Sequence, residues 1–363
     1  MRFSYYVALA VLAVIGVGLA FTFEKPVTDS VQHGYRGTGM VQVYNRLALE
    51  GQAAVNQVPE AQPPVEPAGQ PASAVYENVK VLGNVDANEF LRLMTAMTEW
   101  VSPDNGDPNQ GCAYCHNLEN MADDTKYTHK VSRRMIQMTQ HINTSWKTHV
   151  KDTGVTCYTC HRGQNVPSGI WFDGEEKGYK GLVGNRAGQN MPAPAAGLAS
   201  LPSDPFSPFL SREEEIRVIG GTALPTGNRA STKQTEWTYS LMMHMSTSLG
   251  VNCTYCHNSR SFSQWDQSSP QRNIAWYGIR LARDLNDNFL DPLQPVYPPH
   301  RLGPLGDAPK SNCTTCHLGA YKPLYGAQML KDYPAFALPP AQSAAIPADT
   351  KTAATNAEPK GVQ

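Results

Sequence analysis

The sequence has 363 residues, a formal net charge of −1 and a charged fraction of 17%. A near-neutral chain with 41% hydrophobic residues is neither a disordered charged tail nor a protein whose main partner is nucleic acid. Its 28 prolines and 29 glycines predict long connections and a modest amount of regular structure.

The chain begins with an apolar run, Phe3–Phe23, that contains no charged residue. A membrane-spanning helix needs about 20 such residues, so the run suits a span. The alternative is a cleaved secretory signal with a small-residue site near residues 18–20, although the apolar core of a signal is usually about 7–15 residues long. We expect an uncleaved membrane anchor over residues 1–25. Either interpretation sends the rest of the chain across the membrane into an oxidising compartment.

Residues 26–74 are expected to form an extended arm followed by a linker. The stretch 51–74 reads GQAAVNQVPEAQPPVEPAGQPASA and is rich in proline, alanine and glutamine. This composition is typical of a semi-stiff spacer rather than a folded unit. The folded body is therefore expected to start near Val75.

Amphipathic helices are predicted in the body wherever apolar residues recur at i, i+3 and i+4. Asp86 or Asn88 can cap the first of these helices, and Pro270 opens the last. By contrast, the glycine- and proline-rich residues 163–225 show no clear period and predict irregular structure. The predicted helices are 86–101, 129–150, 235–249 and 270–289.

All eight cysteines fall in CxxC pairs, and a histidine follows each pair at once. The CxxCH motif is the attachment site of c-type haem. Two thiols at this spacing can form thioethers with the two vinyl groups of one porphyrin, and the adjacent imidazole then reaches the iron from one face. We therefore expect four covalently bound c-type haems, one on each motif. The cysteines are Cys112, Cys115, Cys157, Cys160, Cys253, Cys256, Cys313 and Cys316, and the histidines are His116, His161, His257 and His317.

Two zinc sites built from the four CxxC pairs, or disulfides within the halves, are the alternatives. Neither explains the histidines. Only 10 of the 363 residues are histidine, so chance would place four at this offset with a probability on the order of 10⁻⁷. Because every cysteine belongs to a motif, we expect none to be left for a nucleophile, a disulfide or a lipid anchor.

The motifs indicate an internal repeat. Helix, turn and CxxCH occur twice in residues 75–165 and again, less regularly, in residues 235–333. We expect a mainly α fold with much irregular structure, in which two haem-pair halves are related by a pseudo-twofold axis and follow an N-terminal transmembrane helix. The connector would be residues 166–234, and residues 334–363 would form a flexible tail.

Each iron needs a sixth ligand, for which methionine sulfur and a second histidine are the usual donors. Methionines lie on the predicted helices before the first three motifs, where one per helix could serve, although core packing is their usual role. No methionine-bearing helix directly precedes the fourth motif, so His149 is a candidate there by elimination. The methionines are Met94 and Met97, then Met135 and Met138, then Met242, Met243 and Met245.

Several long stretches are specific enough to indicate a family. They include EFLRLMTAMTEWVSP, RRMIQMTQHINTSWKTHV, LMMHMSTSLGVNCTYCHN and PQRNIAWYGIRLARDLN, and they extend over residues 75–335. With them, the sequence resembles the tetrahaem cytochrome c subunit of purple bacterial photosynthetic reaction centres. The stretch GYRGTGM resembles the N-terminal arm of that family.

The resemblance implies a sixth ligand for each haem. These ligands are Met94 for the first haem, Met135 for the second, Met242 for the third and His149 for the fourth. It also implies a near-linear chain of haems, in which the third-motif haem lies closest to the bacteriochlorophyll pair and Arg272 lies beside that haem.

On this resemblance the chain is expected to be an electron-transfer subunit and not an enzyme. It would accept electrons from a soluble c-type cytochrome or a high-potential iron–sulfur protein at the periplasmic face of the photosynthetic inner membrane. It would pass them to the bacteriochlorophyll pair held by the reaction-centre L and M subunits, with the light-harvesting ring as a further candidate partner. A membrane-anchored multihaem reductase or quinol dehydrogenase and a non-photosynthetic electron conduit are the alternatives.

Two features depart from the family. Many members are lipoproteins with a cysteine after the signal, and this sequence has no such cysteine. A longer loop, SPDNGDPNQG, precedes the first motif, and its Asp104 and Asp107 form an acidic surface with Asp123 and Asp124. This surface is either a solvated loop or a docking patch for a basic cytochrome.

Overall fold

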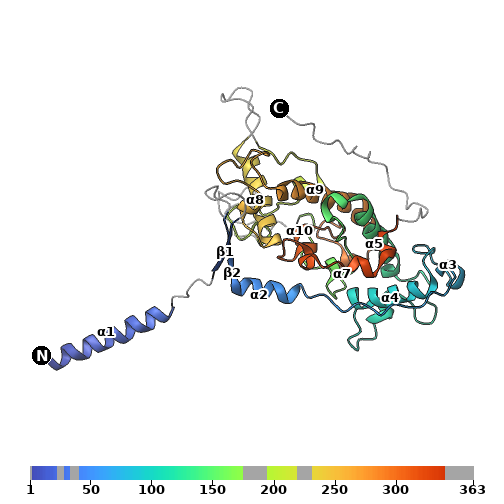
Figure 1. The fold of residues 1–363 in the computed structure, drawn as a ribbon, viewed down its shortest axis with the longest axis horizontal. Helices are drawn as coiled ribbons and strands as arrows, with labels where there is room; N and C mark the ends of the chain where they lie inside the picture. Colours follow the sequence, from blue (N-terminus) through green and yellow to red (C-terminus); the bar gives the residue numbers. More distant parts are fainter. Residues whose placement is uncertain (1, 23–27, 33–40, 175–193, 219–230, 340–363) are drawn as a thin grey trace, which may run out of the picture.

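The computed structural model describes residues 2–22, 28–32, 41–174, 194–218 and 231–339. This part of the chain is mainly helical with long irregular connections, as expected (Figure 1). Its helices and strands are α1 (Arg2–Thr22), β1 (Thr28–Gln32), β2 (Val41–Asn45), α2 (Arg46–Val55), α3 (Ala72–Val75), α4 (Ala87–Val101), α5 (Tyr127–Ser145), α6 (Lys147–Val150), α7 (Cys157–His161), α8 (Thr232–Leu249), α9 (Pro270–Leu285) and α10 (Cys313–His317).

The apolar N-terminal run forms α1, which stands clear of the body (Figure 1). Its segment Ser4–Thr22 has a mean hydropathy of 2.1, and none of it is buried. Among the described helices it alone is long and apolar enough to cross a membrane, and a signal sequence near an N-terminus has the same properties. That α1 is a retained anchor stays a prediction.

An antiparallel hairpin of β1 and β2 follows α1, with Thr28 opposite Asn45. These strands were not predicted, because the sequence has no alternating pattern strong enough to indicate them. Asn45 also caps α2, because its side chain accepts the backbone N–H of Leu47. The stretch GYRGTGM, which resembles the family's arm, lies outside the described residues.

The proline- and alanine-rich stretch 51–74 lies along the body of its own chain. The guanidinium of Arg92 on α4 donates to the carbonyl of Pro63 at 2.9 Å, and the hydroxyl of Tyr158 on α7 donates to the carbonyl of Gln57 at 3.0 Å. The predicted spacer is thus held by α4, which precedes the first motif, and by α7, which contains the second.

Three of the four predicted body helices are confirmed as α4, α8 and α9, with small shifts at their ends. Asp86 caps α4, since its carboxylate accepts the N–H of the second residue of the helix. A wide turn, Asn286–Leu290, ends α9 four residues earlier than predicted. The buried side chain of Asn286 donates to the carbonyl of Ser311 at 3.0 Å, so this turn is fixed to the residues just before the fourth motif.

The single helix predicted over 129–150 is wrong, because it is two helices, α5 and α6, separated at Trp146. This residue leaves the helical conformation, with φ −113° and ψ 29°. Its indole N–H donates to the carboxylate of Asp284 on α9 at 2.6 Å. The tertiary contact interrupts the helix and places α6 against α9.

In the part of the chain that the structure describes, the core consists of three apolar clusters. The first surrounds Trp100 of α4, whose ring packs edge-on against Tyr333 at 4.6 Å. The second surrounds Leu241 of α8 and Phe209 of the turn Ser207–Ser211. The third joins α5 to α9 through Leu285 and its neighbours.

The loose tail predicted from residue 334 is wrong for its first residues. Phe336 is completely buried in the first cluster. The side chain of Asn143 on α5 donates to the carbonyl of Phe336 at 3.0 Å. The rest of the predicted tail, residues 340–363, lies outside the described part of the chain.

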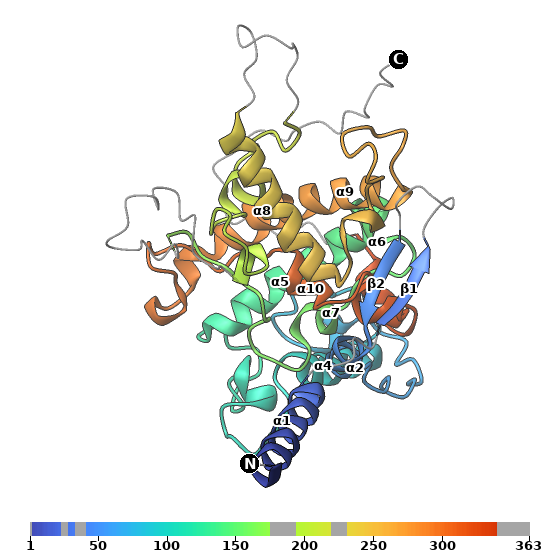
Figure 2. The same cartoon turned by 90° about the vertical axis from the view of Figure 1, so that its left-hand side faces the viewer.

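Helices from the two predicted halves meet at the centre of the body. In the first half α4 contacts α7, in the second α8 contacts α10, and α7 contacts α10 across the halves. Both views show α7 and α10 near one another (Figures 1 and 2). The second and fourth CxxCH motifs, which form α7 and α10, are therefore neighbours.

Candidate haem-binding site

The first and third motifs have one local structure. Each begins with a short 3₁₀ turn, Gly111–Tyr114 in the first and Cys253–Tyr255 in the third. A hydroxyl near the start of the next helix fixes each turn, because Thr128 donates to the carbonyl of Tyr114 and Ser269 donates to that of Tyr255, both at 2.6 Å.

The second and fourth motifs share a different structure, the short helices α7 and α10. Each has a capping box in which the residue before the first cysteine and a threonine three positions on satisfy one another's backbone N–H groups. Each ends in a left-handed residue directly after the histidine, Arg162 with φ 52° and Leu318 with φ 46°.

All four motif histidines are anchored in the same way. In each, Nδ1 lies 2.9 Å from a backbone carbonyl oxygen, which can only accept, so Nδ1 carries the proton and Nε2 keeps its lone pair. A histidine that ligates a metal through Nε2 needs this tautomer. The pairs are His116 with Met121, His161 with Gln164, His257 with Phe262, and His317 with Ala320.

His149 has the same anchor and lies opposite the fourth motif. Its Nδ1 donates to the carbonyl of Ile274 on α9 at 2.9 Å. The centroids of the His149 and His317 rings are 6.2 Å apart, with an angle of 70° between the rings. Two opposed imidazoles that each bind a metal at about 2 Å have centroids about 6 Å apart. The spacing therefore fits one ion between the two rings.

Burial keeps both of these imidazoles neutral. It is the main cause that lowers the pKa of His317 to about 4, and it also lowers the pKa of His149. A neutral imidazole offers a lone pair to a metal, whereas a protonated one does not. Burial lowers the pKa of His161 and His257 as well.

Three further histidines among the described residues have other partners. The His129 ring lies 4.6 Å from that of His116, which is too close for an ion between the rings. Nε2 of His141 is hydrogen-bonded to the carboxylate of Asp284 at 2.6 Å. His244 is buried within 3.2 Å of the hydroxyl of Ser248 on its own helix.

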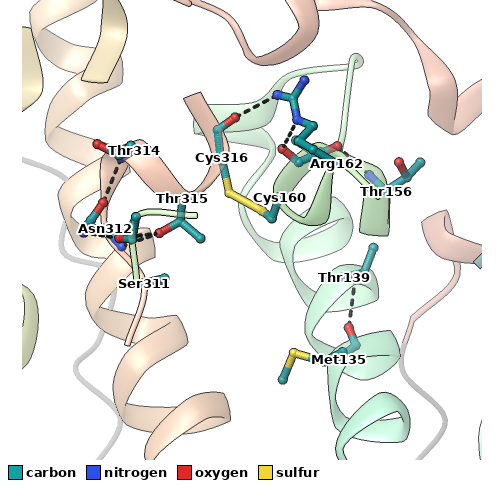
Figure 3. Close-up of a disulfide and its surroundings, with 12 residues drawn as sticks. Met135, Thr139, Thr156, Cys160, Arg162, Ser311, Asn312, Thr314, Thr315 and Cys316 are labelled. Atoms are coloured by element: carbon teal, nitrogen blue, oxygen red, sulfur yellow. Dashed lines mark hydrogen bonds between the residues drawn. A yellow bond between two sulfur atoms is a disulfide. The ribbon is translucent and has the colours of Figure 1, made fainter. Parts of the chain in front are cut away.

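The methionines assigned by the resemblance lie on the expected helices and are partly buried. Met94 packs on the first cluster with Met97, and Met242 packs on the second with Met245. Met135 lies on α5, one turn before Thr139, whose hydroxyl donates to its carbonyl (Figure 3). Their role as iron ligands stays a prediction.

Cys160 of α7 and Cys316 of α10 form a disulfide, with their Cα atoms 4.4 Å apart (Figure 3). The prediction that no cysteine forms a disulfide is wrong for this pair. A sulfur atom in a disulfide carries no hydrogen and cannot add to a vinyl group as a thiol does. While this disulfide exists, neither Cys160 nor Cys316 can form a thioether with haem. The other six cysteines are free thiols and fit haem attachment as they stand.

Two arginines lie close to the motifs. The guanidinium of Arg162 donates to the carbonyl of Cys316 at 3.2 Å and so joins the second motif to the fourth (Figure 3). Arg272, at the start of α9, lies 4.2 Å over the ring of Trp265 and donates to the carbonyl of Gln264. Among the described residues, neither guanidinium forms an ion pair with a carboxylate.

Sequence reasoning missed the groups that orient the histidines. Five of them are backbone carbonyls, which any residue carries, so no sequence signal could have revealed them. Gly278 is different, because an isolated glycine inside a helical pattern is itself a signal of close packing. It lies on α9 against the ring of His149.

Repeated CxxCH motifs with uniformly oriented histidines, held in a helical and loop-rich body, define a c-type cytochrome. Residues 24–337 match the family model described as photosynthetic reaction centre cytochrome C subunit. The chain belongs to this family, and it is accordingly a haem-bearing electron-transfer subunit of the reaction centre.

Individual relatives agree. The chain is 53% identical over 347 residues to the photosynthetic reaction center cytochrome c subunit of Rubrivivax gelatinosus, which covers 95% of this chain and 93% of the relative. It is 49% identical over 312 residues to the subunit of the same name from Thermochromatium tepidum, covering 86% and 76%. The corresponding subunit of Roseobacter denitrificans is 40% identical over 341 residues, covering 90% of each chain.

Proposed function

We propose that the chain holds four covalent haems and relays electrons through them to the photo-oxidised bacteriochlorophyll pair. Each CxxCH motif holds one haem through its two cysteines and its histidine. The sixth ligands are Met94, Met135, Met242 and His149 for the first to fourth haems. When bound, haem supplies the one-electron chemistry, and the chain supplies ligation, burial and position, which set each potential.

One observation carries this proposal. Every motif histidine is fixed through Nδ1 to a carbonyl, so that Nε2 faces away from its anchor and is free to ligate. Zinc ribbons and structural disulfides give no reason for this repeated orientation. The distance of 6.2 Å between the ring centroids of His149 and His317 independently supports the proposed pairing of these two histidines as ligands of one haem.

The disulfide adds a condition to haem attachment. Cys160 and Cys316 each become available only when a thiol reductant gives two electrons to the bond between them. Each thiol would then be able to add its S–H across a vinyl group of a haem held by its own motif. The proposal therefore requires a reduced chain at the moment of haem attachment.

The pseudo-twofold arrangement is part of the proposal. The first and third motifs share one turn and the second and fourth share one capped helix, as expected if residues 75–165 and 235–333 are related halves. The threonine and serine hydroxyls that fix the first and third turns each lie 14 residues after the carbonyl to which they donate.

We place the electron donor, a soluble c-type cytochrome or a high-potential iron–sulfur protein, at the first motif. Cys112 is exposed there, beside a surface hollow lined by Asp104, Asp107 and Leu118. Acidic groups beside an exposed apolar side chain suit a basic partner. Asp124 does not add to this charge, since Lys80 and Arg133 pair with it at 2.9 and 2.7 Å.

We propose the remaining contacts from the resemblance to the family. The third-motif haem faces the L and M subunits and their pigment pair, and the light-harvesting ring is a further neighbour. The anchor α1 holds the body at the periplasmic face of the photosynthetic inner membrane.

Haem counting and redox titration of the purified full-length subunit test the ligand set. We expect four haems per chain by pyridine haemochrome and intact mass. Replacement His149→Met should raise the potential of one haem, because methionine favours the reduced iron. The exposed His300→Gln serves as a control and should change no potential. Fewer than four haems, or an unchanged set of potentials in His149→Met, would contradict the assignment.

A further inference from the structure

The ring of His149 is held by α9 rather than by its own helix. Its helix, α6, contains only Lys147–Val150, and Lys151 then leaves it with φ 54°. Its Nδ1 donates to the carbonyl of Ile274, which lies in the second turn of α9. The orientation of the imidazole therefore depends on how closely it can approach the backbone of α9.

Gly278 makes this approach possible. It lies one helical turn after Ile274, on the same face of α9. A Cβ atom at position 278 would come within 2.6 Å of Cε1, 3.1 Å of Nδ1 and 3.3 Å of Nε2 of His149. The nearest of these contacts is shorter than real Cβ atoms show, and the ring, with Nδ1 fixed, has no flexible end that could move aside.

We propose that Gly278 is a positioning residue for the sixth ligand of the fourth haem. With hydrogen at this position, the imidazole of His149 lies against α9, with Nδ1 on the Ile274 carbonyl and the ring opposite that of His317. A methyl group pushes the ring off the helix and breaks the axial pair. This inference rests on the proposed ligation by His149.

Helix propensity alone predicts that Gly278→Ala stabilises α9, whereas the proposed contact predicts the loss of a haem ligand. The two expectations can therefore be told apart by experiment. Glycine inside a helix is less favourable than alanine, because it loses more backbone entropy on folding. If Gly278 served no contact, Gly278→Ala would leave the haems alone and would slightly strengthen α9. A loss confined to one haem therefore identifies the contact with the ring.

The first experiment compares Gly278→Ala with Gly51→Ala in the full-length, haem-loaded subunit. Gly51 is the matched control, because it lies inside α2 with nothing within 4 Å of its Cβ position. Near-infrared magnetic circular dichroism distinguishes bis-histidine from histidine–methionine ligation. We expect wild type and Gly51→Ala to show one bis-histidine haem, and Gly278→Ala to lose that signature while the other three potentials stay unchanged.

The outcomes separate the two claims. A wild-type subunit without a bis-histidine haem contradicts the ligation by His149 itself. A wild-type subunit with this haem, together with a Gly278→Ala variant that keeps it, overturns the role of Gly278 alone.

A second variant keeps the test valid if Gly278→Ala does not mature. In a His149→Gly background the ring is absent, so adding Gly278→Ala should change neither haem content nor spectrum. The double variant should therefore mature as well as His149→Gly alone. A double variant that is worse than His149→Gly would show that Gly278 acts through some other contact and would overturn the inference.

Discussion

Single hydrogen bonds decide what the motif histidines can bind. A carbonyl oxygen at 2.9 Å from Nδ1 fixes the tautomer in which Nε2 is unprotonated. Burial strengthens this selection, because it disfavours the charged ring and lowers the pKa of His317 to about 4. Each motif thus presents an imidazole whose Nδ1 is held and whose Nε2 is directed away from its anchor.

Lys310, three residues before the first cysteine of the fourth motif, forms ion pairs that stabilise this part of the chain. Its side chain is 2% exposed, and its ammonium lies 2.5 Å from Asp307, 3.1 Å from Asp173 and 3.6 Å from Asp291. Burial disfavours the charged form, but the hydrogen bond to Asp307 and the neighbouring carboxylates outweigh it and raise the pKa of Lys310. The cation holds three carboxylates together just before Cys313.

We expect Lys310→Met to destabilise the protein by about 3 kcal/mol, since it leaves partly buried carboxylates without their cation. Thermal unfolding of the haem-loaded subunit measures the change. Lys233→Met is the matched control, because Lys233 is 63% exposed and its ion pair with Glu236 at 3.3 Å should contribute less than about 1 kcal/mol. Equal effects of the two substitutions would contradict the role given to Lys310.

At the scale of elements, α5 and α9 are joined through one carboxylate. Asp284 of α9 accepts from the ring of His141 and the indole of Trp146, each at 2.6 Å, and from the amide of Asn288 at 2.7 Å. Burial alone would raise the pKa of Asp284, but these hydrogen bonds outweigh it and lower the pKa. The ionised carboxylate is therefore the form that the fold stabilises.

The sign of the resulting pH dependence follows. A carboxyl whose pKa is lower in the folded than in the unfolded chain stabilises the fold above its unfolded pKa of about 4, and this stability is lost as the pH falls through the folded pKa. We expect Asp284→Asn to cost about 1–3 kcal/mol at pH 7. Its free energy of unfolding should also fall less steeply than that of wild type below pH 4. Parallel curves in denaturant titrations at several pH values would rule out this account.

Particular elements show how far the sequence alone leads. The helix α4 was predictable because its apolar period and the cap Asp86 are both local. The break at Trp146 was not, because it depends on a partner more than a hundred residues away, Asp284. The same applies to Phe336, whose burial depends on α5 and not on the proline- and alanine-rich composition around it.

In the candidate site, too, some features were predictable from the sequence and others were not. The spacing of CxxCH revealed the cysteines and the motif histidines, because thioether and axial bonds need that spacing. His149 emerged only by elimination and resemblance, and the structure adds its ring opposite His317. The disulfide between Cys160 and Cys316 joins motifs 156 residues apart, which no local pattern could indicate.

At the scale of the whole molecule, the two predicted halves are tied together at the motifs themselves. The helices α7 and α10 are in contact, and His149 from the first half lies opposite His317 from the second. The fourth haem would thus depend on both halves. The exposed Cys112 of the first motif belongs to the proposed donor surface, and in the same proposal α1 is the link to the membrane.

The most direct test of the proposed relay is flash spectroscopy on native membranes poised so that the haems are reduced. After a single flash, the α-band of c-type haem is followed in time. The account predicts bleaching that is faster than any collision with a soluble carrier, because a haem of this subunit lies next to the pigment pair. The absence of fast bleaching, in membranes where four haems per subunit have been counted, would contradict the relay and would favour a reductase or an electron conduit.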